Sequence, residues 1–408
     1  MQKSIEKRFD IVIVGGGIIG IAIAIEIAKK DKGLSILLIE KEKSIGLHAS
    51  GRNSGVIHAG FYYKPQSLKA KFCREGNIQL KETCKKLGVP VLNTGKVVVS
   101  KDTNQASILE KLFMRGVENG VNLEIFEDHF LSKFEPLAKS KGGFIWSPDT
   151  CVSDPKMLIS KLAKQALDLG IKFVFGESPQ FKNRELYLNG QRILYRHLIN
   201  SAGSQAIDIA NSFNAGKKYA VLPFLGTYAY LNSGSLPLKT LIYPLPHDVN
   251  PFLGVHFTIT PSNQIKIGPS AIPILGREQY TLLQLPSLKD MFQTMKSSCA
   301  MGVKHPCSTF TLAIGEFPKI RVSKLVKEAS MLVPSAGVAG VWKRKAGGIR
   351  SQLVDLHSGE LVQDFLIEKT ENETHILNAV SPGWTSAIPF AKWIYVEHVL
   401  PKIAARKL

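Results

Sequence analysis

The apolar positions at the start of the chain fall into a strand, a helix and a second strand. Ile11–Val14 is a β-branched run typical of a buried parallel strand. Three glycines, Gly15-Gly16-Gly17, end this run, and the apolar stretch Ile18–Lys30 predicts a helix. Ser35–Glu40 predicts a second strand that ends in an acid. This order predicts a βαβ unit near the N-terminus.

Four further segments follow along the chain. The first mixes helices at Ser67–Leu87, Asn104–Asn119 and Lys156–Leu169 with strands at Gly95–Ser100, Ile171–Phe175 and Ile193–Asn200. In the second, short runs between Pro, Gly and Asn turns predict an antiparallel sheet at Thr227–Leu231, Phe252–Thr260 and Gln264–Ile267. The polar, basic stretch Thr281–Val326 predicts no clear element. The C-terminal part predicts strands at Arg350–Val354, Leu361–Glu368 and His375–Leu377 and a helix over about Ser386–Val399.

These patterns predict an α/β (α+β) fold in which two domains are interleaved. A Rossmann-like nucleotide-binding domain is expected from residues 1–90, 145–215 and 335–408. A substrate-binding domain built on the antiparallel sheet is expected from residues 91–144 and 216–334.

The N-terminal turn has the spacing G-x-G-x-x-G, which predicts a dinucleotide site. Gly15 permits the tight turn, Gly17 lets a pyrophosphate approach the backbone, and Gly20 lets the helix pack closely on the strand. Ile18 begins the helix whose free N–H groups face the anion. Glu40, about 20 residues after the last glycine, can accept hydrogen bonds from a ribose, and Lys41 follows it.

Charge and composition limit the classes of molecule that the protein is expected to bind. The formal charge of +19 fits an anionic substrate, a bilayer surface or nucleic acid. The basic residues are scattered and no nucleic-acid motif accompanies them, so nucleic acid is an unlikely partner by this criterion. Five cysteines without C-x-x-C and ten histidines without metal-ligand spacing lead us to expect neither a disulfide framework nor a metal. Without a long apolar run or a targeting segment, we expect a cytoplasmic location.

A Gly-, Ser- and Asn-rich loop, HASGRNSGVIHAGFYY at 48–63, follows the second strand. Such a loop can lie along an extended cofactor and offer it N–H and hydroxyl donors, with Arg52 placed to meet a diphosphate. His58 lies in the same loop, where it could equally be a structural histidine.

This loop and several ordered segments resemble the L-2-hydroxyglutarate dehydrogenase/oxidase family, FAD-dependent members of the D-amino-acid-oxidase superfamily. The resemblance extends along nearly the whole chain and is carried by YKPQSLKAKFC at 63–73, DTCVSDPKML at 149–158, PFLGVHFT at 251–258, IGPSAIPILGRE at 267–278, KAGGIRSQLVD at 345–355 and LNAVSPGWTSAIP at 377–389. It implies an FAD-binding domain of the glutathione-reductase type and oxidation of a small 2-hydroxy acid, most directly L-2-hydroxyglutarate.

The resemblance also implies where FAD lies. The adenine half is expected on the N-terminal glycines and Glu40, near Gly176, with Ala202 and Gly203 closing the other side. The pyrophosphate and ribityl chain are expected along Ser50, Arg52, Asn53 and Ser54. The flavin ring is expected beside Gly347, Gly348, Gly383, Thr385 and Ser386. His48 precedes the position where related dimethylglycine-type dehydrogenases attach flavin covalently, so a covalent link there is a hypothesis.

The reaction requires a cation for the substrate carboxylate and a base for the hydroxyl proton while hydride leaves for the flavin. Arg350 can fork onto a carboxylate, and His256 or His58 can serve as the base near neutral pH. Tyr62, Tyr63 and Arg277 are candidates for the distal carboxylate. Leu225, where the family usually has Arg, and Trp384 depart from the family pattern and put the exact substrate in doubt.

Two alternatives remain at this stage. One is a glycine- or sarcosine-type amine or amino-acid oxidase, and the other is a basic flavoprotein that binds tRNA or another polyanion without turnover. The charge further suggests peripheral docking on the anionic inner face of a membrane, with electrons passed to a quinone or to oxygen. The basic positions behind this hypothesis are Lys289, Lys296, Lys304, Lys319, Arg321, Lys324, Lys327, Lys402, Arg406 and Lys407.

Overall fold

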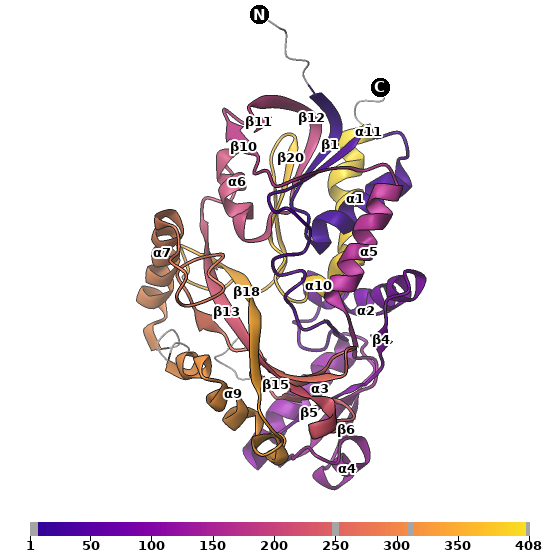
Figure 1. Cartoon of the computed structure of the whole chain (residues 1–408), viewed down its shortest axis with the longest axis vertical. Coiled ribbons are helices and arrows are strands. Elements are labelled where there is room, and N and C mark those ends of the chain that lie inside the picture. Colours follow the sequence, from indigo (N-terminus) through magenta and orange to yellow (C-terminus); the bar gives the residue numbers. More distant parts are fainter. Residues whose placement is uncertain (1–6, 247–252, 308–313, 405–408) are drawn as a thin grey trace, which may run out of the picture.

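The computed structural model describes residues 7–246, 253–307 and 314–404 and contains two large sheets, one above the other in Figure 1. The predicted βαβ unit is present as β1 (Lys7–Val14), α1 (Ile18–Lys30) and β2 (Ile36–Glu40). β1 pairs in parallel with β2 on one side and with β12 (Gln191–Asn200) on the other. The mixed α/β class is therefore confirmed.

The upper sheet has eight strands, with β1 near its centre. Its order is β10 (Gln180–Lys182), β11 (Glu185–Leu188), β12, β1, β2 and β9 (Lys172–Phe175). In addition, β20 (Glu373–Asn378) pairs with β12, and β19 (Leu366–Lys369) pairs with β20. Ile11 and Ile13 of β1 face a core formed with helices, whereas Val12 and Val14 face a second core on the other side. Because both faces are covered, the strand is a continuous apolar run.

The helices of the first core come from distant parts of the sequence. They are α1, α2 (Leu68–Lys86), α5 (Pro155–Asp168) and α10 (Gly383–Ile394), with the short α6 (Ala206–Ser212) on the opposite side of the sheet. The predicted C-terminal helix is thus two pieces, because α10 ends at Ile394 and the turn Tyr395–Val399 is π-helical before α11 (Leu400–Ala404).

The lower sheet has nine strands and is mostly antiparallel. Its order is β17 (Ile272–Pro273), β13 (Tyr219–Asn232), β16 (Gln264–Gly268), β15 (His256–Ile259), β14 (Leu241–Pro244), β5 (Lys96–Val99), β7 (Phe144–Ser147) and β6 (Glu124–Phe126), with β18 (Lys343–Asp355) along β13. Part of the predicted strand Phe252–Thr260 lies outside the described residues. A small third sheet joins β3 (Val56–Ile57), β8 (Cys151–Ser153) and β4 (Val91–Leu92).

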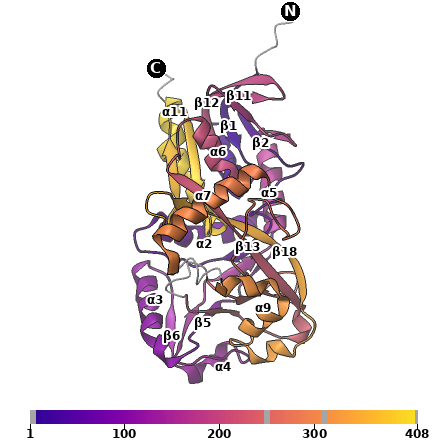
Figure 2. The same cartoon turned by 90° about the vertical axis from the view of Figure 1, so that its left-hand side faces the viewer.

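The long antiparallel pair of β13 and β18 extends from the lower sheet toward the upper one, as Figure 1 shows. The predicted boundaries put β18 with the nucleotide-binding segments, but its pairing places it in the nine-stranded sheet. The boundaries as a whole stay a prediction. Figure 2 shows the sheet flanked by α3 (Ala106–Glu118), α4 (Leu131–Phe134) and α9 (Val322–Ala329), with α7 (Leu288–Lys304) across β13.

The segment without a clear prediction, Thr281–Val326, contains all of α7 and the first five residues of α9. α7 packs only a narrow stripe, Thr294, Ser297 and Met301, against the protein. Because two of these three buried residues are polar, the sequence showed little difference in polarity between the buried and the exposed face of the helix.

Candidate active site

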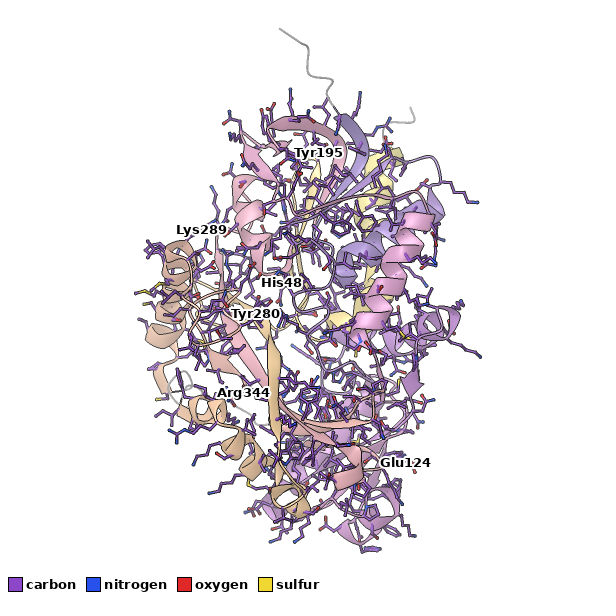
Figure 3. All side chains as sticks on the ribbon, viewed as in Figure 1. His48, Glu124, Tyr195, Tyr280, Lys289 and Arg344 are labelled. Atoms are coloured by element: carbon purple, nitrogen blue, oxygen red, sulfur yellow. The ribbon has the colours of Figure 1, made fainter. Side chains whose placement is uncertain are left out.

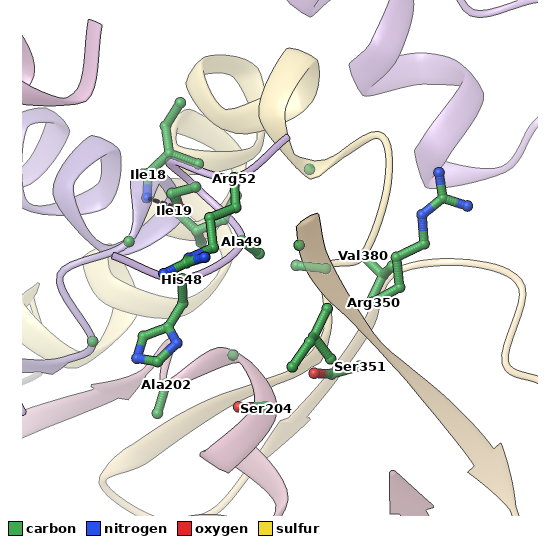
Figure 4. A pocket seen from close by; sticks show the side chains of 18 of the residues that line it. Ile18, Ile19, His48, Ala49, Arg52, Ala202, Ser204, Arg350, Ser351 and Val380 are labelled. Atoms are coloured by element: carbon green, nitrogen blue, oxygen red, sulfur yellow. Dashed lines mark hydrogen bonds between the residues drawn. The ribbon is translucent and has the colours of Figure 1, made fainter. Parts of the chain in front are cut away.

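A cavity of ≈ 800 Å³ lies where the two large sheets meet. Its walls come from the β1–α1 turn, the loop 46–54, the turn 201–205 after β12, the strand β18, the segment 379–382 and the first two residues of α10. In Figure 4, Arg350 and Ser351 on β18 lie on the other side of the view from His48 and Ala202. A single cavity therefore joins the predicted cofactor residues to the predicted catalytic residues.

The glycines of the first turn make room that side chains would fill. Gly15 has φ +108°, and a Cβ there would lie 2.5 Å from the carbonyl oxygen of Ser201. A Cβ on Gly17 would lie 3.1 Å from Oγ of Ser50, which accepts a hydrogen bond from the Ile18 N–H at 3.0 Å. Gly20 is buried away from the cavity, and a Cβ there would overlap the Gly15 carbonyl. The turn and the start of α1 thus form a cradle suited to a pyrophosphate.

Glu40 lies at the end of β2 and lines the cavity beside this cradle. Its two carboxylate oxygens accept hydrogen bonds from the backbone N–H groups of Gly16, at 2.8 Å, and Glu42, at 2.9 Å. These bonds fix the carboxylate while leaving further lone pairs for a ribose hydroxyl. Lys41 also lines the cavity, and its ammonium contacts Glu42 at 2.8 Å and Glu278 at 2.7 Å.

Most other predicted cofactor residues line the cavity, namely Arg52, Asn53, Ser54, Ala202, Gly203, Gly348 and Gly383. Gly176 is not among the lining residues, because it forms the turn after β9, where its N–H donates to the Glu42 carbonyl, and Ser178, Pro179 and Phe181 form the wall instead. Gly347 packs against Gly226 of β13. Thr385 and Ser386 are fully buried in α10, and Thr385 Oγ1 accepts from the His58 N–H at 3.1 Å, so they support the wall from behind.

A polar network surrounds His48 at the cavity wall, near the middle of the molecule in Figure 3. One ring nitrogen of His48 lies 2.5 Å from the Tyr280 hydroxyl and the other 2.9 Å from a Glu42 oxygen. The Arg52 guanidinium lies 4.0 Å from the centre of the Tyr280 ring. Among the described residues, Glu42, His48 and Glu278 could together reach a metal ion, but the Lys41 ammonium already contacts both carboxylates.

The predicted catalytic residues His58, His256 and Arg350 line the same part of the cavity as Tyr243. The His256 ring stacks on Tyr243 with the centroids 3.8 Å apart, and its Nδ1 lies 2.9 Å from the Gly254 carbonyl. Nδ1 of His58 is buried without a hydrogen-bond partner. The fold therefore brings two imidazoles and a guanidinium from three distant segments to one wall.

Both imidazoles are held neutral. Burial, together with the charges of Lys96 and Arg350, lowers the pKa of His58 from 6.5 to about 3. Burial is also the main reason why the pKa of His256 lies well below 6.5, with contributions from Arg350, His58 and Lys96. The expectation of near-neutral pKa values was wrong for the site without substrate, because sequence does not show desolvation or neighbouring cations.

The three residues predicted for the distal carboxylate differ in position. Tyr62 and Tyr63 are not among the residues that line the cavity. The Tyr62 hydroxyl is buried at the lower sheet without a hydrogen-bond partner, and burial raises the pKa of Tyr62 and of Tyr63 well above 10. Arg277 lines the cavity but bonds Asp208 at 2.9 Å, Asp290 at 2.6 Å and the Ser204 carbonyl at 3.1 Å. These two ion pairs use the charge that the prediction reserved for a substrate.

The two departures from the family pattern fall in different places. Leu225 is buried in a small apolar cluster with Ile272, Ile274 and Ile349 and does not line the cavity. Trp384 does line it, and its indole N–H has no hydrogen-bond partner. Sequence reasoning missed Tyr243 and Lys96. The available signal for Lys96 was a single cation at the start of the apolar strand Lys96–Val99.

The fold and the site define a flavoprotein oxidoreductase: the glycine cradle, the helix N-terminus and the fixed Glu40 carboxylate fit the phosphates and ribose of FAD. A family model described as FAD dependent oxidoreductase matches residues 10–395. The L-2-hydroxyglutarate dehydrogenase of Caenorhabditis elegans mitochondria is 33% identical over 98% of this chain and 95% of its own length. That of Indibacter alkaliphilus is 33% identical over 93% and 96%.

The chain therefore belongs to the FAD-dependent oxidoreductase family and, within it, to the group of the L-2-hydroxyglutarate dehydrogenases. FAD is its cofactor. Among solved structures, L-alpha-glycerophosphate oxidase from Mycoplasma pneumoniae with FAD bound has a TM-score of 0.74 and 22% identity over 95% of this chain and 93% of that one. Glycine oxidase from Geobacillus kaustophilus has a TM-score of 0.71 and 16% identity over 95% and 94%, so both show the fold alone.

Proposed function

We propose that the protein oxidises L-2-hydroxyglutarate to 2-oxoglutarate. The observation that carries this proposal is the single cavity that joins the cofactor cradle to Arg350, His58 and His256, in a chain similar along its length to L-2-hydroxyglutarate dehydrogenases. Bound FAD would supply the acceptor for the hydride, which carries the two electrons of the oxidation. The chain itself must hold the substrate, exclude water and accept the hydroxyl proton.

Each of these tasks has a candidate residue on the described wall. Arg350 is proposed to hold the carboxylate beside the reacting carbon through a forked pair of hydrogen bonds. A neutral imidazole, of His256 or His58, is proposed to accept the hydroxyl proton. The negative charge of a bound substrate would raise the pKa of either imidazole and so make it a better base.

The test is the bleaching of the flavin's visible absorption band when substrates are added without oxygen. We expect rapid bleaching by L-2-hydroxyglutarate and little by the D-enantiomer, glycine, sarcosine or L-proline. Faster bleaching by an amine would replace this proposal with the amine-oxidase alternative. No bleaching by either class, together with salt-dependent RNA binding, would support the non-catalytic alternative.

His48 was the candidate for covalent attachment of the flavin. Both of its ring nitrogens contact other residues, Tyr280 and Glu42, which supports non-covalent binding. Acid precipitation of the protein decides the matter: a yellow supernatant means that the flavin is not attached to the chain.

We further propose that α7 docks the protein on an anionic membrane surface, where a quinone accepts the electrons. No described helix is long and apolar enough to cross a membrane. On α7, however, Leu288, Phe292, Met295 and Val303 are exposed by 84%, 72%, 54% and 79%, and their spacing puts them on one face. The preceding loop exposes Leu283 and Leu285 by 95% and 92%. Such a stripe is typical of a helix that lies in a bilayer interface.

The charge of this surface supports the same proposal. Lys296 and Lys304 are exposed on α7, and Arg321, Lys324 and Lys327 are exposed on or next to α9. Lys289 is also exposed on α7, but its ammonium pairs with Asp208 at 2.8 Å. Lys319 does not contribute, because it is 13% exposed and paired with Glu316 and Glu328. Lys402 lies in α11, and Arg406 and Lys407 lie outside the described residues. Each exposed cation near an anionic surface is worth about 1 kcal/mol.

Co-sedimentation with vesicles tests the docking. The protein should bind anionic vesicles at low salt and leave them at high salt, while the double variant Leu288→Ser, Phe292→Ser should bind less without losing flavin or turnover with a soluble dye. Equal binding of the variant and the parent would reject α7 as the docking helix. Fast peroxide formation in air, with no binding to either kind of vesicle, would favour oxygen as the acceptor.

A further inference from the structure

Lys96 is a buried cation that none of the roles above uses. It begins β5 and has no exposed surface. Its ammonium has no hydrogen-bond partner. Three aromatic rings surround it instead, with their centroids 4.3 Å (Phe61), 4.6 Å (Tyr62) and 4.8 Å (Tyr243) from Nζ.

An ammonium in such a place is costly unless something else stabilises it. Burial without a paired anion disfavours the charged form, and it lowers the pKa of Lys96 from 10.5 to about 7. The other fully buried lysine of this sheet, Lys266, differs because its Nζ donates to the Asn53 carbonyl at 3.1 Å. Cation–π contacts with the three rings offset part of the cost for Lys96 but supply no counter-charge.

The aromatic cage of Lys96, defined as Phe61, Tyr62 and Tyr243, adjoins the substrate wall of the cavity. Tyr243 belongs to both, because it contacts Lys96, stacks on His256 and lines the cavity. Lys96 is also close enough for its charge to lower the pKa of His58 and of His256. The hydroxyls of Tyr62 and Tyr243 are, like the ammonium, buried without hydrogen-bond partners.

We propose that Lys96 makes the site selective for a dicarboxylate, because it acts through the Tyr243 hydroxyl on the substrate's second carboxylate, while Phe61 and Tyr62 complete its aromatic cage. This inference rests on the proposed function and adds a residue that helps to recognise the second carboxylate of the substrate. A cation over the face of a phenol ring withdraws electron density from it and strengthens the hydroxyl as a donor. The dianion then meets two positive charges, Arg350 at the carboxylate beside the reacting carbon and Lys96 behind the other.

Charge balance explains why the cation is buried rather than exposed. Arg277, the other cation considered for this role, is neutralised by Asp208 and Asp290. A monocarboxylate would leave Lys96 and the Tyr243 hydroxyl without a partner, so the cost of the buried cation disfavours binding of a monocarboxylate only. Lys96 is therefore a specificity-determining residue that acts through others, and not a catalytic residue.

The test compares two ligands of equal length that cannot react. Glutarate has a carboxylate at each end and pentanoate at one end, and each is titrated into the FAD-loaded protein while the flavin absorption spectrum is recorded. In Lys96→Met we expect affinity for glutarate to fall about 10- to 100-fold and affinity for pentanoate to change by less than about 3-fold. Lys141→Met is the control and should change neither affinity. Lys141 is exposed, and its backbone N–H donates to the carbonyl of Ser100, the residue that follows β5.

Two outcomes would overturn the proposal. Equal losses for glutarate and pentanoate would make Lys96 a structural residue, and unchanged binding of both would remove it from recognition. If Lys96→Met does not fold, Tyr243→Phe gives the same test, because it keeps the ring on His256 and removes only the hydroxyl; it should lower the preference for glutarate selectively. Failure of the parent protein to oxidise L-2-hydroxyglutarate would reject the proposed function, while the ligand comparison would still decide the role of Lys96.

Discussion

The two halves of the cavity differ in how their polar groups are satisfied. In the cofactor half, Glu40 holds two backbone N–H groups, Ser50 accepts from the start of α1, and His48 contacts both Tyr280 and Glu42. In the substrate half, buried polar atoms without hydrogen-bond partners gather near one wall. They are His58 Nδ1, Tyr62 Oη, Lys96 Nζ and Tyr243 Oη.

This difference separates a site organised by the backbone from one that needs its ligand. The cofactor cradle is complete before anything binds, because glycines and a helix N-terminus define it. The substrate half holds a buried ammonium, that of Lys96, whose cost the aromatic rings offset only in part and a bound anion would offset further. Changes in the first half should therefore affect occupancy by FAD, and changes in the second should affect turnover and selectivity with FAD still bound.

The largest expected effect is the loss of flavin in Gly17→Val. A Cβ at this position already comes within 3.1 Å of Ser50 Oγ, and the two added methyl groups would occupy space that the pyrophosphate needs. The purified variant should be colourless. Gly33→Val is the matched control, because a Cβ there meets nothing within 4 Å, and it should stay yellow. Full flavin content in Gly17→Val would refute the cradle.

The next effect concerns the proton acceptor on the substrate wall. His256→Ala or His58→Ala should lower kcat about 10²- to 10⁴-fold while flavin content is unchanged. Because the pKa of His58 is about 3 and that of His256 is also depressed, the free enzyme should keep a neutral imidazole down to acidic pH. The acid limb of kcat/KM, measured from pH 4 to 9, should therefore lie below pH 6. If neither variant changes kcat, the base lies elsewhere.

Arg350→Ala should have a somewhat smaller effect, on substrate capture. Loss of a charge-assisted forked contact corresponds to about 2–4 kcal/mol, or roughly 30- to 1,000-fold in kcat/KM. Arg350→Lys should recover only part of this, because an ammonium lacks the planar fork. Steady-state kinetics with L-2-hydroxyglutarate provide the measurement, and unchanged values in Arg350→Ala would exclude the role.

The same contrast explains what the sequence could predict. The cofactor half follows from local order along one segment, since strand, glycine turn, helix, second strand and acid adjoin in the chain, and each element appears where the pattern placed it. The class, the FAD cofactor and the family followed from that segment and from the ordered resemblances.

The substrate half could not be derived in this way, because its properties depend on which distant segments meet. Sequence gave no indication that Lys96 of β5 would lie against Tyr243 of β14, or that Asp208 and Asp290 would neutralise Arg277. Burial also shifted the pKa of both histidines in a direction that composition cannot reveal. For the same reason the sequence did not predict that β18 pairs with β13, since this pairing joins residues more than a hundred positions apart.

The smallest expected effect is on folding stability, and it tests Lys96 without any measurement of turnover. In the folded protein the pKa of Lys96 is lowered to about 7, whereas in the unfolded chain it returns to 10.5. Between these values the unfolded state binds the proton and the folded state does not, so the contribution of Lys96 to folding improves as pH rises through this window and is least favourable at or below pH 7. Lys96→Met should therefore be more stable than the parent near pH 7, by about 1–4 kcal/mol, because an apolar side chain replaces an unpaired charge.

Thermal unfolding of the substrate-free, FAD-loaded protein at pH 7 and pH 9.5 measures this. The advantage of Lys96→Met should shrink toward the higher pH, whereas Lys141→Met, at an exposed position, should show no such trend. A variant that gains stability while losing its preference for glutarate would show that the parent keeps the buried cation for recognition. Lower stability of Lys96→Met at both pH values would instead mean that the ammonium stabilises the aromatic cage. Lys96 would then not be an unsatisfied group of the substrate half that needs its ligand.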